Sequence, residues 1–189
     1  HMTEQINLSY VCTLWYKPRK TMQTLIENGR GHRAALIVAI ASGMIQALPV
    51  YSSNESLGVS VYLIGALVGF FGLYLFAWLL RNFGRWFGAQ ASLREVRTGM
   101  GLGLMPWLLC FLVLFLLRQN FGSSAVGQYF WLFFVPLVYG YIIVILSLTA
   151  VLRLTLLKTF LCLVLTIIFS LFPLTFLFQV LAPLLFSTQ

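Results

Sequence analysis

Five long apolar stretches decide what this chain can fold into. They cover residues 34–51, 57–80, 99–117, 129–152 and 159–186, and polar or charged residues separate each stretch from the next. About 20 helical residues cross the hydrocarbon core of a bilayer, so every stretch can form a transmembrane helix. Because 60% of the residues are hydrophobic and only 8% are charged, a water-soluble surface is excluded. The pattern predicts an all-α, polytopic membrane protein with a bundle of five transmembrane helices.

The apolar stretches are expected to be helices because they lack the alternation of membrane barrel strands. The last stretch contains Pro173 and Pro183, which raises the alternative of a hairpin that enters and leaves on one side. Each half of a hairpin split at Pro173 would be about 21 Å long, too short to cross the membrane. A single tilted or kinked helix is therefore expected.

The twelve Lys and Arg residues are distributed unevenly about the predicted bundle. One side carries Lys17, Arg19, Lys20, Arg30, Arg33, Arg81, Arg85, Arg94, Arg97, Arg153 and Lys158. Arg118 alone falls on the other side. Short basic loops remain in the cytoplasm, so the amino terminus is predicted to be cytoplasmic and the carboxyl terminus external. The net charge of +8 fits a bilayer with anionic headgroups as partner. The basic residues form no separate domain, so nucleic acid is not predicted as a partner.

Residues 1–33 form a cytoplasmic amino-terminal segment ahead of a single transmembrane domain, residues 34–189. Pro18 suits the first turn of a helix, because its missing N–H would have no helical partner there. A short helix is expected from Lys17 to Glu27, ending at Asn28 and Gly29. Its apolar side chains share one face and bases surround it, so it is predicted to lie in the headgroup layer.

The second cytoplasmic segment runs from Arg81 to Arg97. Ser92 is followed three residues later by Glu95, the spacing of a capping box. The third transmembrane helix is therefore expected to begin in the cytoplasm, well before its apolar part. We also expect a Glu–Arg pair to join the two cytoplasmic segments as a modest structural contact.

The two segments together contribute the candidate cytoplasmic surface. Its residues are Trp15, Lys17, Pro18, Arg19, Arg85, Trp86 and Arg94. A simple interfacial anchor and a docking surface for a cytoplasmic or membrane protein both fit this composition.

Small residues mark where helices are expected to touch. Gly65 and Gly69 form one small-xxx-small pair, Gly99 and Gly103 form another, and Pro106 follows in the third stretch. Such pairs allow close backbone approach in lipid, where the hydrophobic effect does not drive helix association. These faces could hold the monomer together or join two copies into a homo-oligomer.

The residues of an enzyme site are scarce. The five apolar stretches contain no Asp, Glu, His, Lys or Arg, and His32 is an isolated histidine near the membrane boundary. Cys12, Cys110 and Cys162 are scattered, without the spacing of a metal site. No catalytic residue, metal or cofactor is therefore predicted.

A small channel or transporter for a neutral solute or a lipid is the alternative function. Ion-coupled carriers usually keep ionisable groups near the membrane midplane, and these stretches offer none. The candidate pathway residues for an uncharged cargo are Gln46, Tyr139 and Gln179.

The chain resembles the Yip family of Ypt/Rab-interacting membrane proteins, in its prokaryotic branch. The resemblance rests on Trp15-Tyr16-Lys17-Pro18-Arg19, the stretch from Gly88 to Val96, Pro106 and the five apolar stretches. It implies a five-helix bundle with a cytoplasmic amino terminus, in the inner membrane of a prokaryote. Eukaryotic members act in vesicle trafficking and bind prenylated Rab-type GTPases. The resemblance thus implies a non-catalytic adaptor or organiser of membrane proteins and lipids, in membrane trafficking or homeostasis.

Overall fold

The computed structural model of the protein describes residues 9–53 and 59–186. Over these residues the regular structure is helical, with no strands. The helices are α1 (Ser9–Leu14), α2 (Pro18–Glu27), α3 (His32–Ser53), α4 (Ser60–Trp86), α5 (Leu93–Gly103), α6 (Met105–Phe121), α7 (Ser123–Gln128), α8 (Phe130–Leu152) and α9 (Leu156–Phe186).

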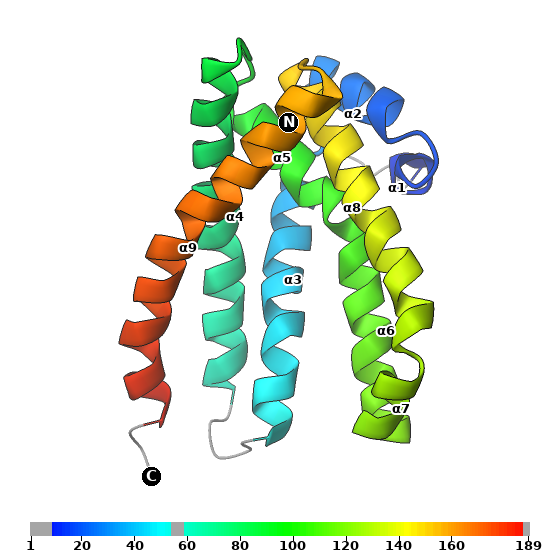
Figure 1. Cartoon of the computed structure of the whole chain (residues 1–189), viewed down its shortest axis with the longest axis vertical. Helices are drawn as coiled ribbons and strands as arrows, with labels where there is room; N and C mark the ends of the chain where they lie inside the picture. The colour runs from blue at the N-terminus through cyan, green and yellow to red at the C-terminus, as the bar shows by residue number, and fades with distance from the viewer. Residues whose placement is uncertain (1–8, 54–58, 187–189) are drawn as a thin grey trace, which may run out of the picture.

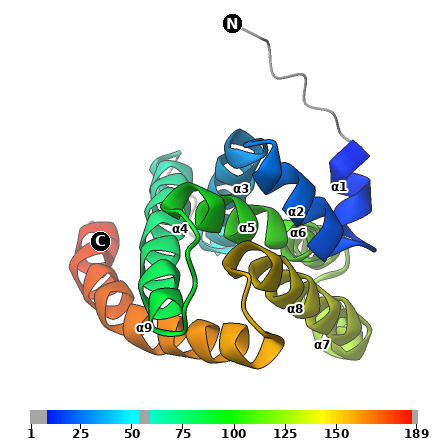
Figure 2. The ribbon, with the colours of Figure 1, turned by 90° about the horizontal axis from the view of Figure 1, so that it is seen from above.

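The long helices run roughly side by side, and the shorter helices α1, α2 and α5 gather at one end (Figure 1). Figure 1 shows α4 and α9 on one side of α3, and α6 and α8 on the other. At the upper end α5 crosses the bundle, and α1 and α2 lie beside α8. The view from above shows α9 wrapping around the outside of α4 (Figure 2). The extensive contact of α3 with both α4 and α5 makes it the central helix of the bundle.

Four helical segments are long and apolar enough to cross a membrane, which confirms an integral, multi-pass membrane protein. They are α4, the continuous segment Leu93–Phe121, α8 and the Leu156–Leu177 part of α9. In α3 the apolar segment with described side chains is shorter, His32–Gln46. The second predicted stretch, residues 57–80, and its helix do not have the same bounds. The helix α4 begins at Ser60 and ends at Trp86, beyond the end of the predicted stretch.

The third predicted helix is built from two pieces. The capping box is confirmed, because the Ser92 hydroxyl accepts from Glu95 N at 3.3 Å and the Glu95 carboxylate accepts from Ser92 N at 3.0 Å. These bonds begin α5 at Leu93, before the apolar part of the chain, as expected. The two pieces, α5 and α6, meet at Leu104, whose backbone angles remain helical, so the segment continues through it. Pro106 lies in the first turn of α6, a position where proline is tolerated.

The last apolar stretch forms one helix, which confirms the tilted or kinked single helix over the hairpin. Pro173 and Pro183 both lie inside α9. Proline removes one backbone hydrogen bond from a helix, but in lipid the neighbouring backbone bonds still keep the segment helical.

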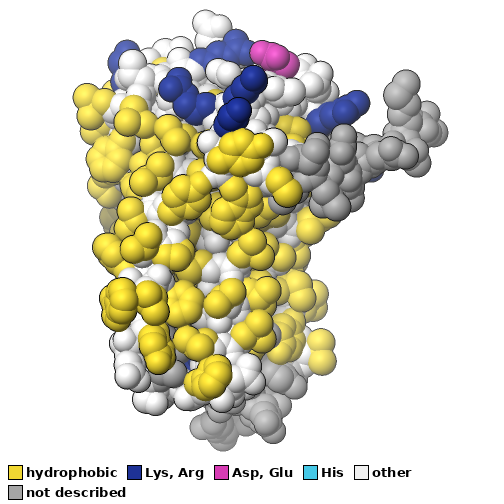
Figure 3. All heavy atoms as spheres, turned by 90° about the vertical axis from the view of Figure 1, so that its right-hand side faces the viewer, with side chains coloured by type: hydrophobic (Ala, Val, Ile, Leu, Met, Phe, Trp, Pro, Cys, Tyr) yellow, Lys and Arg dark blue, Asp and Glu magenta, His cyan; other side chains and the backbone are white. Residues whose placement is uncertain are grey.

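The main core lies toward the end of the bundle that carries α1, α2 and α5. Its fully buried side chains include Met22 of α2, Leu80 of α4, Leu102 of α5, and Leu148 and Leu152 of α8. Away from this end many large apolar side chains are exposed on the outer faces of α6, α8 and α9. That apolar band is visible in Figure 3 and is typical of a surface that faces lipid.

The predicted glycine pairs lie at contacts between helices of one molecule. A Cβ added to Gly69 would meet the backbone of Ala39 and Gly43 in α3, and Gly65 is buried in the same helix. In α5, a Cβ at Gly103 would come within 3.3 Å of the Val144 Cα in α8. Gly99 faces the side chain of Val151, which is also in α8. Small residues therefore bring α3 close to α4, and α5 close to α8.

Candidate functional site

The basic residues of the chain come together at one end of the bundle. They lie on α2, at the start of α3, at the end of α4, on α5 and around the junction of α8 and α9. These segments all lie at the upper end in Figure 1, and on the face shown in Figure 3 the dark blue side chains gather above the apolar band. Arg118 is near the end of α6, toward the opposite end. The fold therefore produces the charge asymmetry from segments far apart in sequence.

The predicted amino-terminal helix is confirmed as α2. Pro18 is its first residue, Asn28 ends it, and Gly29 has a positive φ of 62°, a conformation that glycine adopts without strain. Its buried residues include Met22 and Leu25, and the helix packs against α8 and α5. The apolar face of α2 is thus covered largely by protein, whereas the sequence suggested contact with the headgroup layer.

A hollow of about 360 Å³ lies between α1 and α2 on the basic end. It is lined by Tyr10, Thr13, Tyr16, Lys17, Lys20, Thr21, Thr24 and Leu25. The Thr13 and Thr24 hydroxyls each donate to a backbone carbonyl, and the Thr24 hydroxyl still has lone pairs to accept with. Two lysines and several residues that carry hydroxyl groups line this open hollow, and ammonium and hydroxyl groups suit the oxygens of a carboxylate or a phosphate.

A side-chain hydrogen bond joins the end of α2 to α5. The Arg94 guanidinium on α5 donates to the Gly29 carbonyl, at 3.5 Å, just beyond the end of α2. The Glu95 carboxylate is engaged by Ser92 in the capping box. The contact seen here joins an arginine to a backbone carbonyl, and the expected Glu–Arg pair stays a prediction.

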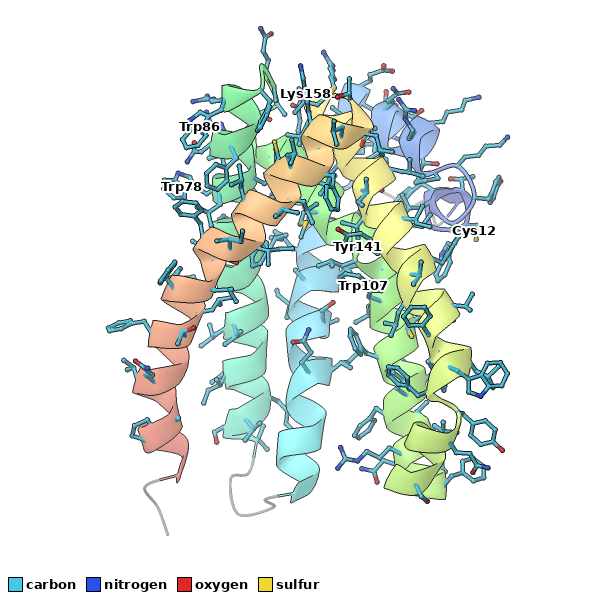
Figure 4. All side chains as sticks on the ribbon, in the orientation of Figure 1. Cys12, Trp78, Trp86, Trp107, Tyr141 and Lys158 are labelled. Atoms are coloured by element: carbon cyan, nitrogen blue, oxygen red, sulfur yellow. The ribbon has the colours of Figure 1, made fainter. Side chains whose placement is uncertain are left out.

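The candidate surface is divided between two sides of the basic end. Lys17 and Arg19 are exposed beside the hollow, Trp15 is half-buried, and Pro18 is buried. Trp86, with 75% of its surface exposed, projects outward from the end of α4 on the far side of the molecule (Figure 4).

Figures 1 and 2 both place the end of α4 and the α1–α2 pair on opposite sides. The structure brings Arg94 toward α2, but it leaves Arg85 and Trp86 apart from Trp15.

The three candidate pathway residues are not brought together. Gln46 lies on α3, Tyr139 on α8 and Gln179 on α9, and each side chain is exposed. In the half of the bundle away from the basic end, α8 and α9 lie on opposite sides of α3 (Figure 1).

The described residues contain no group of three or more His, Cys, Asp or Glu side chains that could hold a metal ion. Cys12 is exposed on α1, whereas Cys110 and Cys162 are buried on α6 and α9. The three thiols are therefore spread over separate helices.

The contribution of α1 could not be anticipated from the sequence. A six-residue helix is too short to show a clear period of apolar side chains. The sequence therefore did not mark Tyr10 and Thr13 as residues of a site. The Lys-Pro pair predicted the start of α2, and only the packing of α1 beside it creates the hollow.

Comparison with known proteins identifies the family. Neither the curated proteins nor the solved structures contain a match to this chain. The Yip1 domain matches residues 12–178, which reach from α1 to within α9 and so include the basic end and the apolar bundle. The chain therefore belongs to the Yip1 domain family.

Proposed function

We propose that this protein is a non-catalytic membrane adaptor whose cytoplasmic face receives an acidic segment of another protein. The proposal includes five membrane spans, with α3 as the fifth. At 22 residues α3 is about 33 Å long, enough to cross the hydrocarbon core. The α1–α2 pair and the end of α9 lie at opposite ends of the molecule, as an odd number of crossings requires (Figure 1).

The charge distribution supports a cytoplasmic location for the basic end. Positive residues close to membrane helices are retained in the cytoplasm. This orientation places α1, α2 and α5 inside and the end of α9 outside. The resemblance to the prokaryotic branch adds the inner membrane as location, and membrane trafficking or homeostasis as the process.

The hollow between α1 and α2 is the observation that carries the adaptor proposal. It combines two lysines and several hydroxyls on a basic surface outside the apolar band. Because α2 packs against α8 and α5, this wall of the hollow is held in place before a partner arrives, which lowers the entropic cost of binding. An acidic peptide segment complements its charge. The separation of Gln46, Tyr139 and Gln179 favours this function over transport.

Photo-crosslinking in native membranes tests the adaptor function. A probe at Tyr16, which is 65% exposed beside the hollow, should capture a discrete cytoplasmic protein. A probe at Trp131, exposed near the other end of the bundle, is the matched control and should not capture it.

The captured protein is then tested with purified components. Lys17→Gln with Lys20→Gln should weaken its binding about tenfold or more, because two charge-assisted contacts are lost. Lys158→Gln, at the same end but outside the hollow, should leave binding within about twofold. Capture of lipid alone at Tyr16, or equal binding by all variants, would refute the adaptor function.

A further inference from the structure

Two arginines away from the hollow have donors that nothing in the described part of the chain satisfies. Arg81 of α4 and Arg97 of α5 are both partly buried. The Nε atom of each is buried and has no hydrogen-bond partner. A guanidinium remains protonated at any physiological pH, and a buried charged donor without an acceptor is costly. The structure therefore contains two cationic groups that lack an anion.

Arg97 of α5 contacts Tyr74, which leaves α4 on the same face as Arg81. The Arg97 guanidinium carbon lies 4.3 Å from the centre of the Tyr74 ring. Arg81 follows Tyr74 by seven residues, which is nearly two helical turns, so both side chains leave α4 in the same direction. The helices α4 and α5 pack together, which brings Arg97 to that face. A cation–π contact with the Tyr74 ring provides no hydrogen-bond acceptor in the plane of the guanidinium, so it does not replace an anion.

The carboxylates described at this end of the bundle are not partners of the two arginines. Glu95 accepts from Ser92 N, and Glu27 is exposed near the end of α2. Among the described residues neither arginine forms an ion pair with them, so no described carboxylate completes this face.

The position of Arg81 along α4 indicates which anion is available. Trp78 and Trp86 lie on either side of it along the helix, with 52% and 75% of their surfaces exposed. Both rings project away from the other helices (Figure 4). Tryptophan prefers the boundary between headgroups and hydrocarbon, so Arg81 lies near the depth of lipid phosphates. Arginine binds two phosphate oxygens through two parallel N–H donors.

We propose that Arg81 and Arg97 form a phosphate site at the α4–α5 junction, occupied by the headgroup of an anionic phospholipid. Tyr74 positions Arg97 through its ring. The site shares no residue with the hollow between α1 and α2, so it can be tested separately from the adaptor function. A bound headgroup would neutralise the two arginines and hold α4 and α5 together at the membrane surface.

Lipid binding to the purified full chain in a neutral detergent tests the site. The probes are dioleoyl phosphatidylglycerol and dioleoylglycerol, which share acyl chains and differ in the phosphate. Native mass spectrometry should show tighter binding of the phospholipid by about tenfold or more. Arg81→Gln and Arg97→Gln should each remove most of this preference, whereas Arg30→Gln, an exposed arginine at the same end, should keep it.

The remaining measurements distinguish a lipid phosphate from free phosphate, and loss of the site from misfolding of a variant. If inorganic phosphate at millimolar concentration displaces the phospholipid, the site takes free phosphate and the lipid assignment is overturned. Equal preference in Arg81→Gln, Arg97→Gln and Arg30→Gln overturns the site itself. If the glutamine variants do not fold, Arg81→Lys and Arg97→Lys are measured instead, because lysine keeps the positive charge and lacks the paired N–H donors of arginine. Unchanged phospholipid affinity in both lysine variants overturns the proposal.

Discussion

Replacing Gly69 by alanine should loosen the contact between α3 and α4, because backbone surrounds the space that the new methyl group would fill. A Cβ at Gly69 would come within 3.2 Å of the Ala39 carbonyl carbon and of the Gly43 Cα, and the Ala39 oxygen lies closer still. Backbone atoms cannot change rotamer to relieve such contacts. The helices must therefore separate along a contact that the small residues make possible.

The expected loss of stability follows from this geometry. Overpacking a well-packed contact costs about 1–3 kcal/mol. For a chain of this size each kcal/mol lowers Tm by about 2–4 °C, so the expected fall is about 2–12 °C. The measurement is the thermal stability of the purified protein in detergent, followed by the loss of its monodisperse peak on size-exclusion chromatography.

Gly72→Ala is the matched control on the same helix. No atom lies within 4 Å of a Cβ at Gly72, so the added methyl group meets no neighbour. Since alanine is the better helix former, its Tm should be unchanged or slightly higher. If Gly69→Ala and Gly72→Ala melt at the same temperature, the close approach of α3 and α4 is refuted.

Three further experiments test other parts of the structure. Ser92→Ala removes the capping box of α5 and should lower stability by about 1 kcal/mol in the same melting assay; an unchanged Tm would show that α5 does not depend on this cap. Trp107→Phe removes the indole N–H that donates to the Leu137 carbonyl at 2.9 Å, and should cost about 1 kcal/mol, whereas Trp131→Phe on the exposed face of α8 should cost less than half of that. Exposed Cys12 should react with a membrane-impermeant maleimide in inside-out vesicles and not in right-side-out ones; the reverse pattern would refute a cytoplasmic basic end.

Local chemistry explains which expectations about the candidate site could be made in advance. Lys17 and Pro18 predict the beginning of α2, and Ser92 with Glu95 predicts the beginning of α5, because helix ends depend on backbone donors a few residues apart. The hollow beside α2 could not be predicted, because it requires α1 to pack at a particular angle. The contact of Arg97 with the Tyr74 ring could not be predicted for the same reason, since the 22 residues between them had to fold first.

The sequence by itself determined that this chain is a helical membrane protein with a basic end, because hydropathy and charge act segment by segment and need no tertiary contact. The tertiary structure alone decided that the apolar face of α2 is buried against protein and that Trp15 and Trp86 lie apart. It also decided that Arg97 of α5 lies over the Tyr74 ring of α4, and that the Nε atoms of Arg81 and Arg97 are buried without a partner among the described residues. These outcomes depend on how helices cross, and in lipid that crossing is set by close packing between distant small residues rather than by the hydropathy of any one segment.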